Sequence, residues 1–431
     1  MSGQREILFL CSRLPFPPNK GDKIRSHAIL AYLTRHYRVH LACFAESESE
    51  SESEMAHFAQ ARQAVNGELL VLPLPALSRY TRMAKAIFDG EPITASVFTS
   101  GSLWRWLSSL SRRCTLDGAV VFGSAMAPCL LDGSIVDPAS VLFDMVDIDS
   151  DKWKQLARAA RGPRRWIYNR EAELLLTLER EAARSFGATL LISPFEAGDF
   201  AALAPDSRAK IKSLTNGVDW NYFSPQACPN PYPAGSLAVA MTGHMDYRPN
   251  VDAALWFAQE VLPLVRQKMP NIVFYAVGAN PPSALRRRAR EDFVVTGYVE
   301  DIRPYLQHAG AVVAPLRLAR GLQNKVLEAM AMQKPVVATW EATRALAANP
   351  GAEILVANDA TGFAASVVDA VAGPRRDQIA AAGQRFVRSR HDWNHITAEF
   401  GGHFDSLLRS TGVPHDGRTS AKPVSAAYAA R

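Results

Sequence analysis

The sequence predicts an α/β protein built from two doubly wound parallel sheets. Short apolar runs alternate with amphipathic stretches along the whole chain of 431 residues, which is typical of parallel strands joined by helical crossovers. The length corresponds to two or three domains at ~100–200 residues per domain. The composition changes between residues 216 and 235, where turn formers and prolines gather in NGVDWNYFSPQACPNPY. We therefore expect a first domain over 1–215, a linker over 216–235 and a second domain over 236–390.

The first domain contains six short apolar runs that are rich in strand-forming residues. Helices are expected over Lys23–Arg35 and Asn169–Phe186, because apolar residues recur there at helical spacing. The strands are expected at Ile7–Cys11, Val39–Phe44, Leu69–Leu74, Ala119–Phe122, Val141–Val146 and Leu190–Ser193.

The second domain repeats the alternation after the linker. Its strands are expected at Leu237–Met241, Ile272–Val277, Phe293–Thr296, Ala311–Ala314, Val336–Ala338 and Ile354–Val356. Its helices are expected at Asn250–Met269, Ile302–Ala309, Leu322–Met332 and Ala364–Val371, and a last one at Arg376–Leu408. The end of that last helix, over 391–409, is a candidate for packing back on the first domain, and 410–431 is expected to be a disordered tail. Two domains of this kind are expected to bind ligands in a cleft at the carboxyl ends of their strands.

Composition excludes several classes of protein. A hydrophobic fraction of 48% and a charged fraction of 21% are those of a globular chain. No apolar run reaches the ~18 residues that span a bilayer, and the N-terminus shows no signal-peptide pattern. Five cysteines, widely spaced and without a CxxC, indicate a reducing compartment and exclude a disulfide scaffold or a cysteine-based zinc site. A soluble cytoplasmic protein is expected.

Basic clusters are the main feature of the charge pattern. The formal net charge is +6, although the low-complexity tract ESESESESE (46–54) contributes five glutamates. The clusters are either ordinary solvated faces or surfaces that attract phosphates, including nucleotides and anionic lipid headgroups. Because no zinc finger, recognition helix or aromatic RNA motif accompanies them, no nucleic-acid partner is expected. The clustered residues are Arg158, Arg161, Arg164 and Arg165, and Arg286, Arg287, Arg288 and Arg290.

The first strand leads into a glycine-containing loop and a helix. Gly21 permits close approach of the backbone to an anion at a helix start, and Lys20, Lys23 and Arg25 add positive charge. The alternative is that proline and glycine only shape a turn between strand and helix. The absence of GxGxxG and GxxxxGK[ST] disfavours a dinucleotide or P-loop site, and hence an oxidoreductase.

The segment from Ala314 to Thr339 carries the clearest candidate site. A helix that Gly321 opens would place Asn324, Lys325 and Glu328 on one polar face. There Lys325 can meet a diphosphate, and the carboxylate of Glu328 can accept two hydroxyls of a ribose. The alternative is a surface Lys–Glu pair worth ~0.3–0.5 kcal/mol.

An acidic segment follows a strand of the first domain and reads DMVDIDSDKW (144–153). Four interpretations of this segment stay open. It could supply a general base that activates an acceptor substrate, recognise that acceptor, or bind a divalent metal. It could also be an ordinary cluster of acidic residues at a helix N-terminus. Among these carboxylates Asp147 and Asp149 are our candidates for catalysis. Ser124 lies at another strand end, and His391 and His395 are expected at the surface of the last helix.

Several motifs resemble, in the right order, retaining glycosyltransferases of family 4, which have the GT-B fold. LEAMAMQKPVVAT is similar to the family's E-A-M-A-x-G-x-P-V-V-A-T signature. KSLTNGVDWNYFSP, MTGHMDYRPNVDAALWF and TGYVED are similar to its domain-junction, glycine-turn and base-binding elements. LPFPPNKGDKIRSH, FDMVDIDSDKW and RGLQNKVLEAMAM further resemble sugar transferases of the PEP-CTERM/exosortase exopolysaccharide systems.

The resemblance implies a set of donor-binding positions. Glu328 matches the second glutamate of E-x7-E, which holds the ribose, while Arg320 stands where the first glutamate, a sugar contact, is expected. His244 and Asn250 stand where the family has two cations, so Arg248 and Lys325 are the available substitutes, and Asn250 is interpreted as a helix N-cap. The other positions implied to face the donor are Gly21, Gly243, Tyr298, Val299, Gly321, Leu322, Gln323 and Asn324.

The resemblance thus implies a sugar transferase that uses a nucleotide-sugar donor. Charge on the leaving diphosphate would be stabilised electrostatically, with no metal or other cofactor and with retention of configuration. The implied acceptor is a saccharide, with a lipid-linked one at the inner membrane face suiting the arginine clusters. Two other readings stay open: a nucleotide-sugar 2-epimerase of the same fold, and a non-catalytic module that binds nucleotide or polysaccharide.

Overall fold

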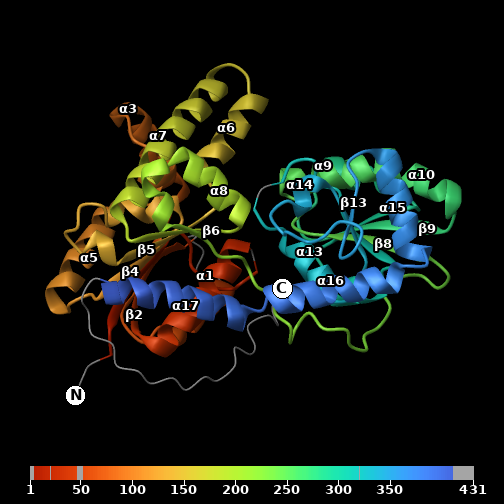
Figure 1. Ribbon diagram of the computed structural model, residues 1–431. Coiled ribbons are helices and arrows are strands. Elements are labelled where there is room, and N and C mark those ends of the chain that lie inside the picture. Colours follow the sequence, from red (N-terminus) through yellow and green to blue (C-terminus); the bar gives the residue numbers. More distant parts are fainter. Residues whose placement is uncertain (1–3, 20, 46–51, 320, 411–431) are drawn as a thin grey trace. The chain divides into compact units, whose positions relative to one another are not determined.

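The computed structural model describes residues 4–19, 21–45, 52–319 and 321–410 (Figure 1). Within them the chain forms two compact units. Unit 1 contains the residues up to Thr215 together with those from Thr397 onward, and unit 2 contains Asn216–Ile396. Arg320, Lys20, most of the acidic tract (46–51) and the tail from 411 lie outside the described residues.

Unit 1 is built on a seven-stranded sheet with the order β3-β2-β1-β4-β5-β6-β7, and all its pairings are parallel. The central strands are apolar almost throughout because both faces of the sheet are covered. The seventh strand was not foreseen, since three residues at a sheet edge carry no apolar pattern. The strands are β1 (Glu6–Cys11), β2 (Arg38–Ala45), β3 (Leu69–Pro73), β4 (Gly118–Phe122), β5 (Val141–Val146), β6 (Ala188–Leu191) and β7 (Ile211–Ser213).

Helices cover both faces of this sheet. Leu8 and Leu10 of β1 share a buried cluster with Leu103, Leu107 and Leu110 of α5, so the alternate residues of β1 face the opposite layer. The helices are α1 (Gly21–His36), α2 (Glu52–Ala64), α3 (Ala76–Asp89), α4 (Ile93–Val97), α5 (Gly101–Arg113), α6 (Asp149–Ala159), α7 (Pro163–Ser185) and α8 (Pro194–Leu203), with a 3₁₀ turn, η1 (Ser124–Cys129), after β4.

The C-terminal helix α17 (Trp393–Ser410) packs on unit 1 (Figure 1). Tyr37, which directly follows α1, donates a hydrogen bond to Asp405 at 2.5 Å, and its ring contacts that of Phe404 at 5.6 Å between centroids. Phe400, Phe404 and Leu408 are buried. The last turns of the chain therefore complete the core of the first unit.

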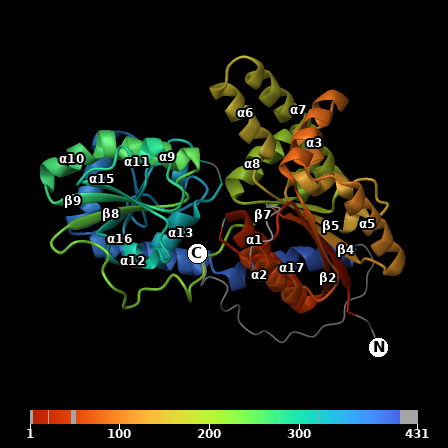
Figure 2. The same cartoon turned by 180° about the vertical axis from the view of Figure 1, so that it is seen from behind.

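Unit 2 is built on a six-stranded parallel sheet with the order β10-β9-β8-β11-β12-β13 (Figure 2). Its strands are β8 (Leu237–Thr242), β9 (Ile272–Val277), β10 (Phe293–Gly297), β11 (Ala311–Ala314), β12 (Val336–Ala338) and β13 (Leu355–Val356). Its helices are α9 (Arg248–Trp256), α10 (Leu262–Lys268), α11 (Ser283–Arg286), α12 (Arg303–His308), α13 (Asn324–Ala331), α14 (Trp340–Thr343), α15 (Ala360–Ala372) and α16 (Arg376–Arg390). The two parallel α/β sheets confirm the predicted fold class.

Two long helices of the sequence prediction are interrupted. The helix expected over 250–269 contains a π turn at Phe257–Val261. Pro263 lies just after this turn, and because proline has no backbone N–H it cannot donate the next regular helical hydrogen bond. The one expected over 376–408 breaks at His391, which is buried rather than exposed. Its carbonyl accepts the Val218 N–H at 2.7 Å, and its Nδ1 lies 2.8 Å from the Asn216 carbonyl oxygen. His395 is at the surface, as expected.

Within the part of the chain that the structure describes, no helix is both long enough and apolar enough to cross a membrane.

Candidate functional site

A polar site forms in unit 2 where β8 ends. Gly243 follows β8 with φ 147°, a conformation that favours glycine. A Cβ on Gly243 would lie 2.8 Å from Asn250 Nδ2 and 3.0 Å from Lys325 Nζ. A Cβ on Gly278, which follows β9, would lie 1.8 Å from the Gly243 carbonyl oxygen. The two glycines therefore allow the backbones after β8 and β9 to approach each other, and Gly243 leaves room above two polar side chains.

Asn250 connects the start of α9 to Lys325. Its Nδ2 donates to the His244 carbonyl at 2.8 Å, and its Oδ1 accepts from Lys325 Nζ at 2.5 Å. The interpretation of Asn250 as an N-cap is wrong, because α9 begins at Arg248 and Asn250 is its third residue. Its buried side chain holds the lysine in place instead.

Lys325 lies at the second position of α13. Burial lowers the pKa of Lys325 to about 8, although the nearby Glu328 carboxylate acts in the opposite direction. The helix begins at Asn324 rather than at Leu322, and Gly321, with φ 61°, precedes it. Glu328 lies one turn further along the helix and is only 7% exposed. Lys325 is thus a cation beside the positive end of a helix, an arrangement that suits an anion.

The remaining predicted donor positions of unit 2 are spread around this site. Leu322 and Gln323 are half-buried just before α13, and Asn324 Oδ1 accepts from Asn216 Nδ2 at 3.3 Å. Arg248 is exposed at the first position of α9. Tyr298, which is 70% exposed, and the half-buried Val299 follow the edge strand β10, which β9 separates from β8.

In unit 1, Gly21 begins α1, but Arg25 is not available to a phosphate. Arg25 is 1% exposed and forms a bidentate pair with Asp144, from Nε to Oδ2 at 2.8 Å and from Nη2 to Oδ1 at 2.9 Å. Its Nη1 donates to the carbonyls of Leu214 and Thr215. The prediction that Arg25 adds charge for an anion is therefore wrong, and Asp144 neutralises a buried cation.

Asp147 and Asp149 lie together just beyond β5. Both accept from Lys152 Nζ at 3.0 Å. Burial disfavours the charged form of Lys152, but the attraction of the two carboxylates is stronger. The pKa of Lys152 therefore lies above its ordinary value. Among the described residues no hydrogen-bond partner was found for the buried Oδ1 of Asp147. Val146, immediately before, has φ 68°, a strained conformation for a β-branched residue.

Two buried glutamates that the sequence analysis missed complete this acidic network. Glu179 of α7 accepts from the Ser150 N–H at 3.0 Å and from the Ser150 hydroxyl at 2.5 Å, and the buried Ser124 hydroxyl donates to it at 3.4 Å. Burial, with the charge of Asp149, raises the pKa of Glu179 to about 8. The sequence did contain a sign of this burial, because Glu179 comes four residues after Leu175 and so lies on the apolar side of α7.

Glu196 of α8 is the second of these glutamates. The sequence Ser193-Pro-Phe-Glu196 has the spacing of a capping box, and Ser193 Oγ does accept the Glu196 N–H at 3.1 Å. Burial, followed by the charge of Asp147, raises the pKa of the Glu196 carboxyl to about 7. The local motif therefore conceals a residue that belongs to the acidic network.

This raised pKa predicts a pH dependence of stability. Because the folded state holds the Glu196 proton up to about pH 7 and the unfolded chain releases it near 4.5, stability falls as the pH rises between these values. The slope for one such group is about 1.4 kcal/mol per pH unit. We expect Glu196→Gln to gain stability relative to the wild type from pH 5 to pH 8, measured by urea unfolding. The exposed Glu173→Gln is the control, and parallel pH curves for wild type and Glu196→Gln would contradict the assignment.

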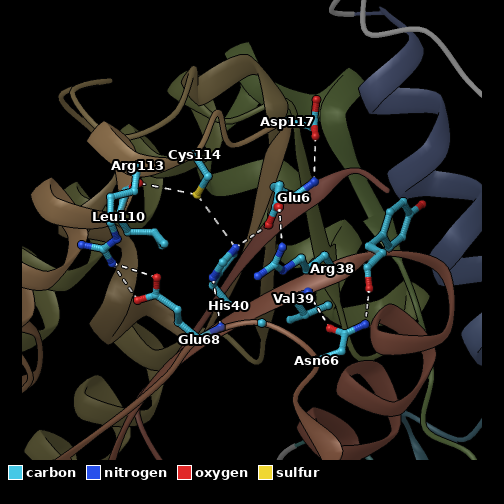
Figure 3. A network of polar contacts seen from close by, with 12 residues as sticks. Glu6, Arg38, Val39, His40, Asn66, Glu68, Leu110, Arg113, Cys114 and Asp117 are labelled. Atoms are coloured by element: carbon cyan, nitrogen blue, oxygen red, sulfur yellow. Dashed lines mark hydrogen bonds and ion pairs between the residues drawn. The ribbon is translucent and has the colours of Figure 1, made fainter. Parts of the chain in front are cut away.

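A third cluster lies at the amino ends of β1 and β2 (Figure 3). Glu6, His40 and Cys114 bring ligand atoms within 4.8 Å of one another, a spacing that could hold a metal ion. His40 Nε2 lies 2.6 Å from Glu6 Oε2 and 3.9 Å from Cys114 Sγ.

The hydrogen bonds of this cluster disfavour a metal. The Glu68 N–H donates to His40 Nδ1 at 3.1 Å, so the ring proton must sit on Nε2, the atom that would ligate. Burial and the charges of Glu6 and Glu68 raise the pKa of the Cys114 thiol, which keeps its proton. We assign the cluster a structural role in fixing the start of β1 against β2.

Comparisons with known proteins agree with the fold. Residues 236–372 match the family model described as glycosyl transferases group 1. The solved structure of HepE from Anabaena in complex with UDP-glucose is similar, with 14% identity, a TM-score of 0.63, and coverage of 93% of this chain and 99% of that one. Sucrose-phosphate synthase from Thermosynechococcus elongatus has 15% identity and a TM-score of 0.69, with coverage of 94% of this chain and 100% of that one.

A trehalose-phosphate synthase (UDP-forming) from Burkholderia vietnamiensis is a further structural relative, with 12% identity, a TM-score of 0.60, and coverage of 93% of this chain and 100% of that chain. A search of the curated proteins found no match. The family model and the two-sheet architecture together support a glycosyltransferase of the GT-B fold.

Proposed function

We propose that this protein is a retaining, hexosyltransferase-type glycosyltransferase of family 4 that moves a sugar from a nucleoside-diphosphate donor to a saccharide acceptor. The observation that carries the proposal is the arrangement of Gly243, Asn250 and Lys325, with Glu328 one turn further along α13, inside the matched region 236–372.

Each member of this arrangement has a role in donor binding. Gly243, without a side chain, leaves room for the diphosphate beside Lys325 Nζ, which Asn250 holds at 2.5 Å. The N-terminus of α13 and the backbone of Gly321, Leu322 and Gln323 add N–H groups and positive potential. As the bond to the sugar breaks, negative charge builds on the diphosphate, and Lys325 stabilises it in place. Glu328 accepts the ribose hydroxyls, and the chain at Tyr298 and Val299 holds the base.

The acceptor side of the proposal lies in unit 1. Asp147 and Asp149 carry the catalytic role, with Lys152 between them at 3.0 Å from each. The Asp147 side chain is 18% exposed, so its carboxylate can accept a hydrogen bond from an acceptor hydroxyl. The acceptor is a lipid-linked saccharide of exopolysaccharide synthesis, as in PEP-CTERM-associated systems. The enzyme then works in the cytoplasm at the inner membrane face. No metal is required, because the cation and helix of unit 2 supply the positive charge.

Calorimetric titration with UDP tests the donor site. UDP is the first choice because HepE was solved with UDP-glucose, and GDP and ADP follow. We expect Glu328→Ala to weaken binding by about 1–3 kcal/mol, or about 5–150-fold, because it removes a hydrogen bond to a charged group. The exposed Glu291→Ala of the same unit is the control. A folded wild type that binds none of the three nucleotides would falsify the proposal, and donor conversion without any acceptor would favour the epimerase.

A further inference from the structure

Helix α3 of unit 1 presents an apolar stripe to solvent. Leu77, Tyr80, Ala84 and Phe88 recur at a spacing of three or four residues and therefore lie on one side of the helix. The exposed fractions are 76% for Leu77, 60% for Tyr80 and 93% for Phe88. Single exposed apolar residues are ordinary, but a row of them along one helix marks an interaction surface.

The opposite side of α3 is firmly attached to unit 1. Ala86 is buried with Ile93 and Val97, and Met83, Ile87 and Ile167 pack against this cluster. Arg170 of α7 donates to the carbonyls of Ala86 at 2.9 Å and Glu91 at 3.1 Å. The inner side of α3 is therefore packed against unit 1, and this contact holds the outer stripe rigidly in place.

The turn between α6 and α7 projects at the same end of unit 1 as α3 (Figures 1 and 2). From 152 to 170 the chain has seven basic residues and no acidic one. Trp166 at this turn is 61% exposed and Leu156 is 47% exposed. Lys152 pairs with Asp147 and Asp149, and Arg170 donates to carbonyls beneath α3. The exposed basic residues of the segment are Lys154, Arg158, Arg161, Arg164 and Arg165.

We propose that the stripe of α3 and the α6–α7 turn together form a docking surface for an anionic lipid bilayer. Aromatic and aliphatic side chains enter the interfacial region, tryptophan favours the headgroup level, and arginines attract anionic headgroups. The surface deepens the proposed function, on which it rests, because it would hold the enzyme against the membrane that carries a lipid-linked acceptor.

The charge of this surface favours a bilayer over a second copy of the chain. In a two-fold dimer through the stripe, the basic turns of the two copies would be brought to the same interface, and like charges repel.

Vesicle flotation of the full chain tests the proposal. Vesicles of phosphatidylcholine alone and mixed with phosphatidylglycerol are compared at low and high salt. We expect binding to the mixed vesicles, weakened by salt. Arg164→Gln with Arg165→Gln should lower the partition coefficient roughly 30-fold, at about 1 kcal/mol per arginine. Leu77→Ser with Phe88→Ser should lower it at least about tenfold, because apolar area no longer enters the interface.

Matched variants in unit 2 serve as controls. Leu318→Ser with Trp340→Ser removes two exposed apolar side chains, 60% and 52% exposed, and Arg287→Gln with Arg288→Gln removes two exposed cations. Both should float like the wild type. UDP titration of every variant shows that unit 2 is intact and separates this proposal from that of the donor site.

Three results would overturn the proposal. The first is equal flotation of the wild type on both vesicle types. The second is a loss of binding in the unit 2 controls as large as in the unit 1 variants, because binding would then depend on the net charge of the protein and not on this surface. The third is a dimer in light scattering that Leu77→Ser with Phe88→Ser dissociates, because the stripe would then be covered by a second copy.

Discussion

Replacement of Arg25 by alanine is expected to lower the free energy of unfolding of unit 1 by about 3–5 kcal/mol, enough to unfold a marginally stable domain. The variant leaves the Asp144 carboxylate buried without its cation, and a buried unpaired charge is among the most destabilising changes known. It also leaves the Leu214 and Thr215 carbonyls without the Nη1 donor. Urea unfolding followed by circular dichroism measures the effect.

Two comparisons isolate the cause of this loss. Arg184→Ala breaks an exposed pair with Asp206, whose side chains are 70% and 75% exposed, and should cost less than about 1 kcal/mol. Arg25→Met combined with Asp144→Leu should recover part of the stability, because no unpaired charge remains although two carbonyls still lack a donor. If Arg25→Ala is no more harmful than Arg184→Ala, the pair does not hold unit 1 together.

The affinity for UDP is expected to fall as the pH rises above about 8. The pKa of Lys325 lies at about 8, so its ammonium group is charged below this pH and neutral above it, while the diphosphate stays fully ionised. Loss of the charged contact should weaken binding by about 1.5–3 kcal/mol, or about 10–150-fold, and Lys325→Ala should show this weaker affinity at every pH. Calorimetric titrations from pH 7 to pH 9, where the uracil ring of UDP stays neutral, measure both.

Arginine provides the decisive variant, because a guanidinium keeps its charge over this whole range. Lys325→Arg should bind UDP with little change between pH 7 and pH 9. Lys334 is the matched control, since burial also lowers its pKa to about 8 while its Nζ donates to the Gln307 carbonyl. Lys334→Arg should keep the pH dependence of the wild type. A wild type whose affinity does not change with pH would show that Lys325 does not meet the diphosphate.

The sequence predicted the structure best where hydrophobicity alone decides which element forms. The buried strands of both sheets are continuous apolar runs, so β5, β9, β11 and β12 have the predicted bounds, and the other predicted strands differ by one or two residues at one or both ends. The predictions were wrong where a tertiary contact overrides a local pattern. His391 ends α16 because strand-like contacts with Asn216 and Val218 hold it, and these residues lie far away in the sequence.

The candidate site was predictable in part for the same reason. Lys325 and Glu328 lie on one helix, and their spacing is visible in the sequence. Asn250 comes to Lys325 from a position 75 residues earlier, so only the fold joins them. Glu179 and Glu196 look like parts of an amphipathic helix and a capping box, and their raised pKa values arise from burial next to Asp149 and Asp147.

The return of α17 to unit 1 determines how the protein can be divided. Unit 2 is one continuous segment, Asn216–Ile396, inserted into a unit 1 that is made from two separate pieces of chain. A chain that stops at Thr215 would lack Phe400, Phe404 and Leu408 and would expose the apolar surface they cover, which favours aggregation. Separate expression therefore suits unit 2, whereas unit 1 needs a short linker that joins Thr215 directly to Thr397.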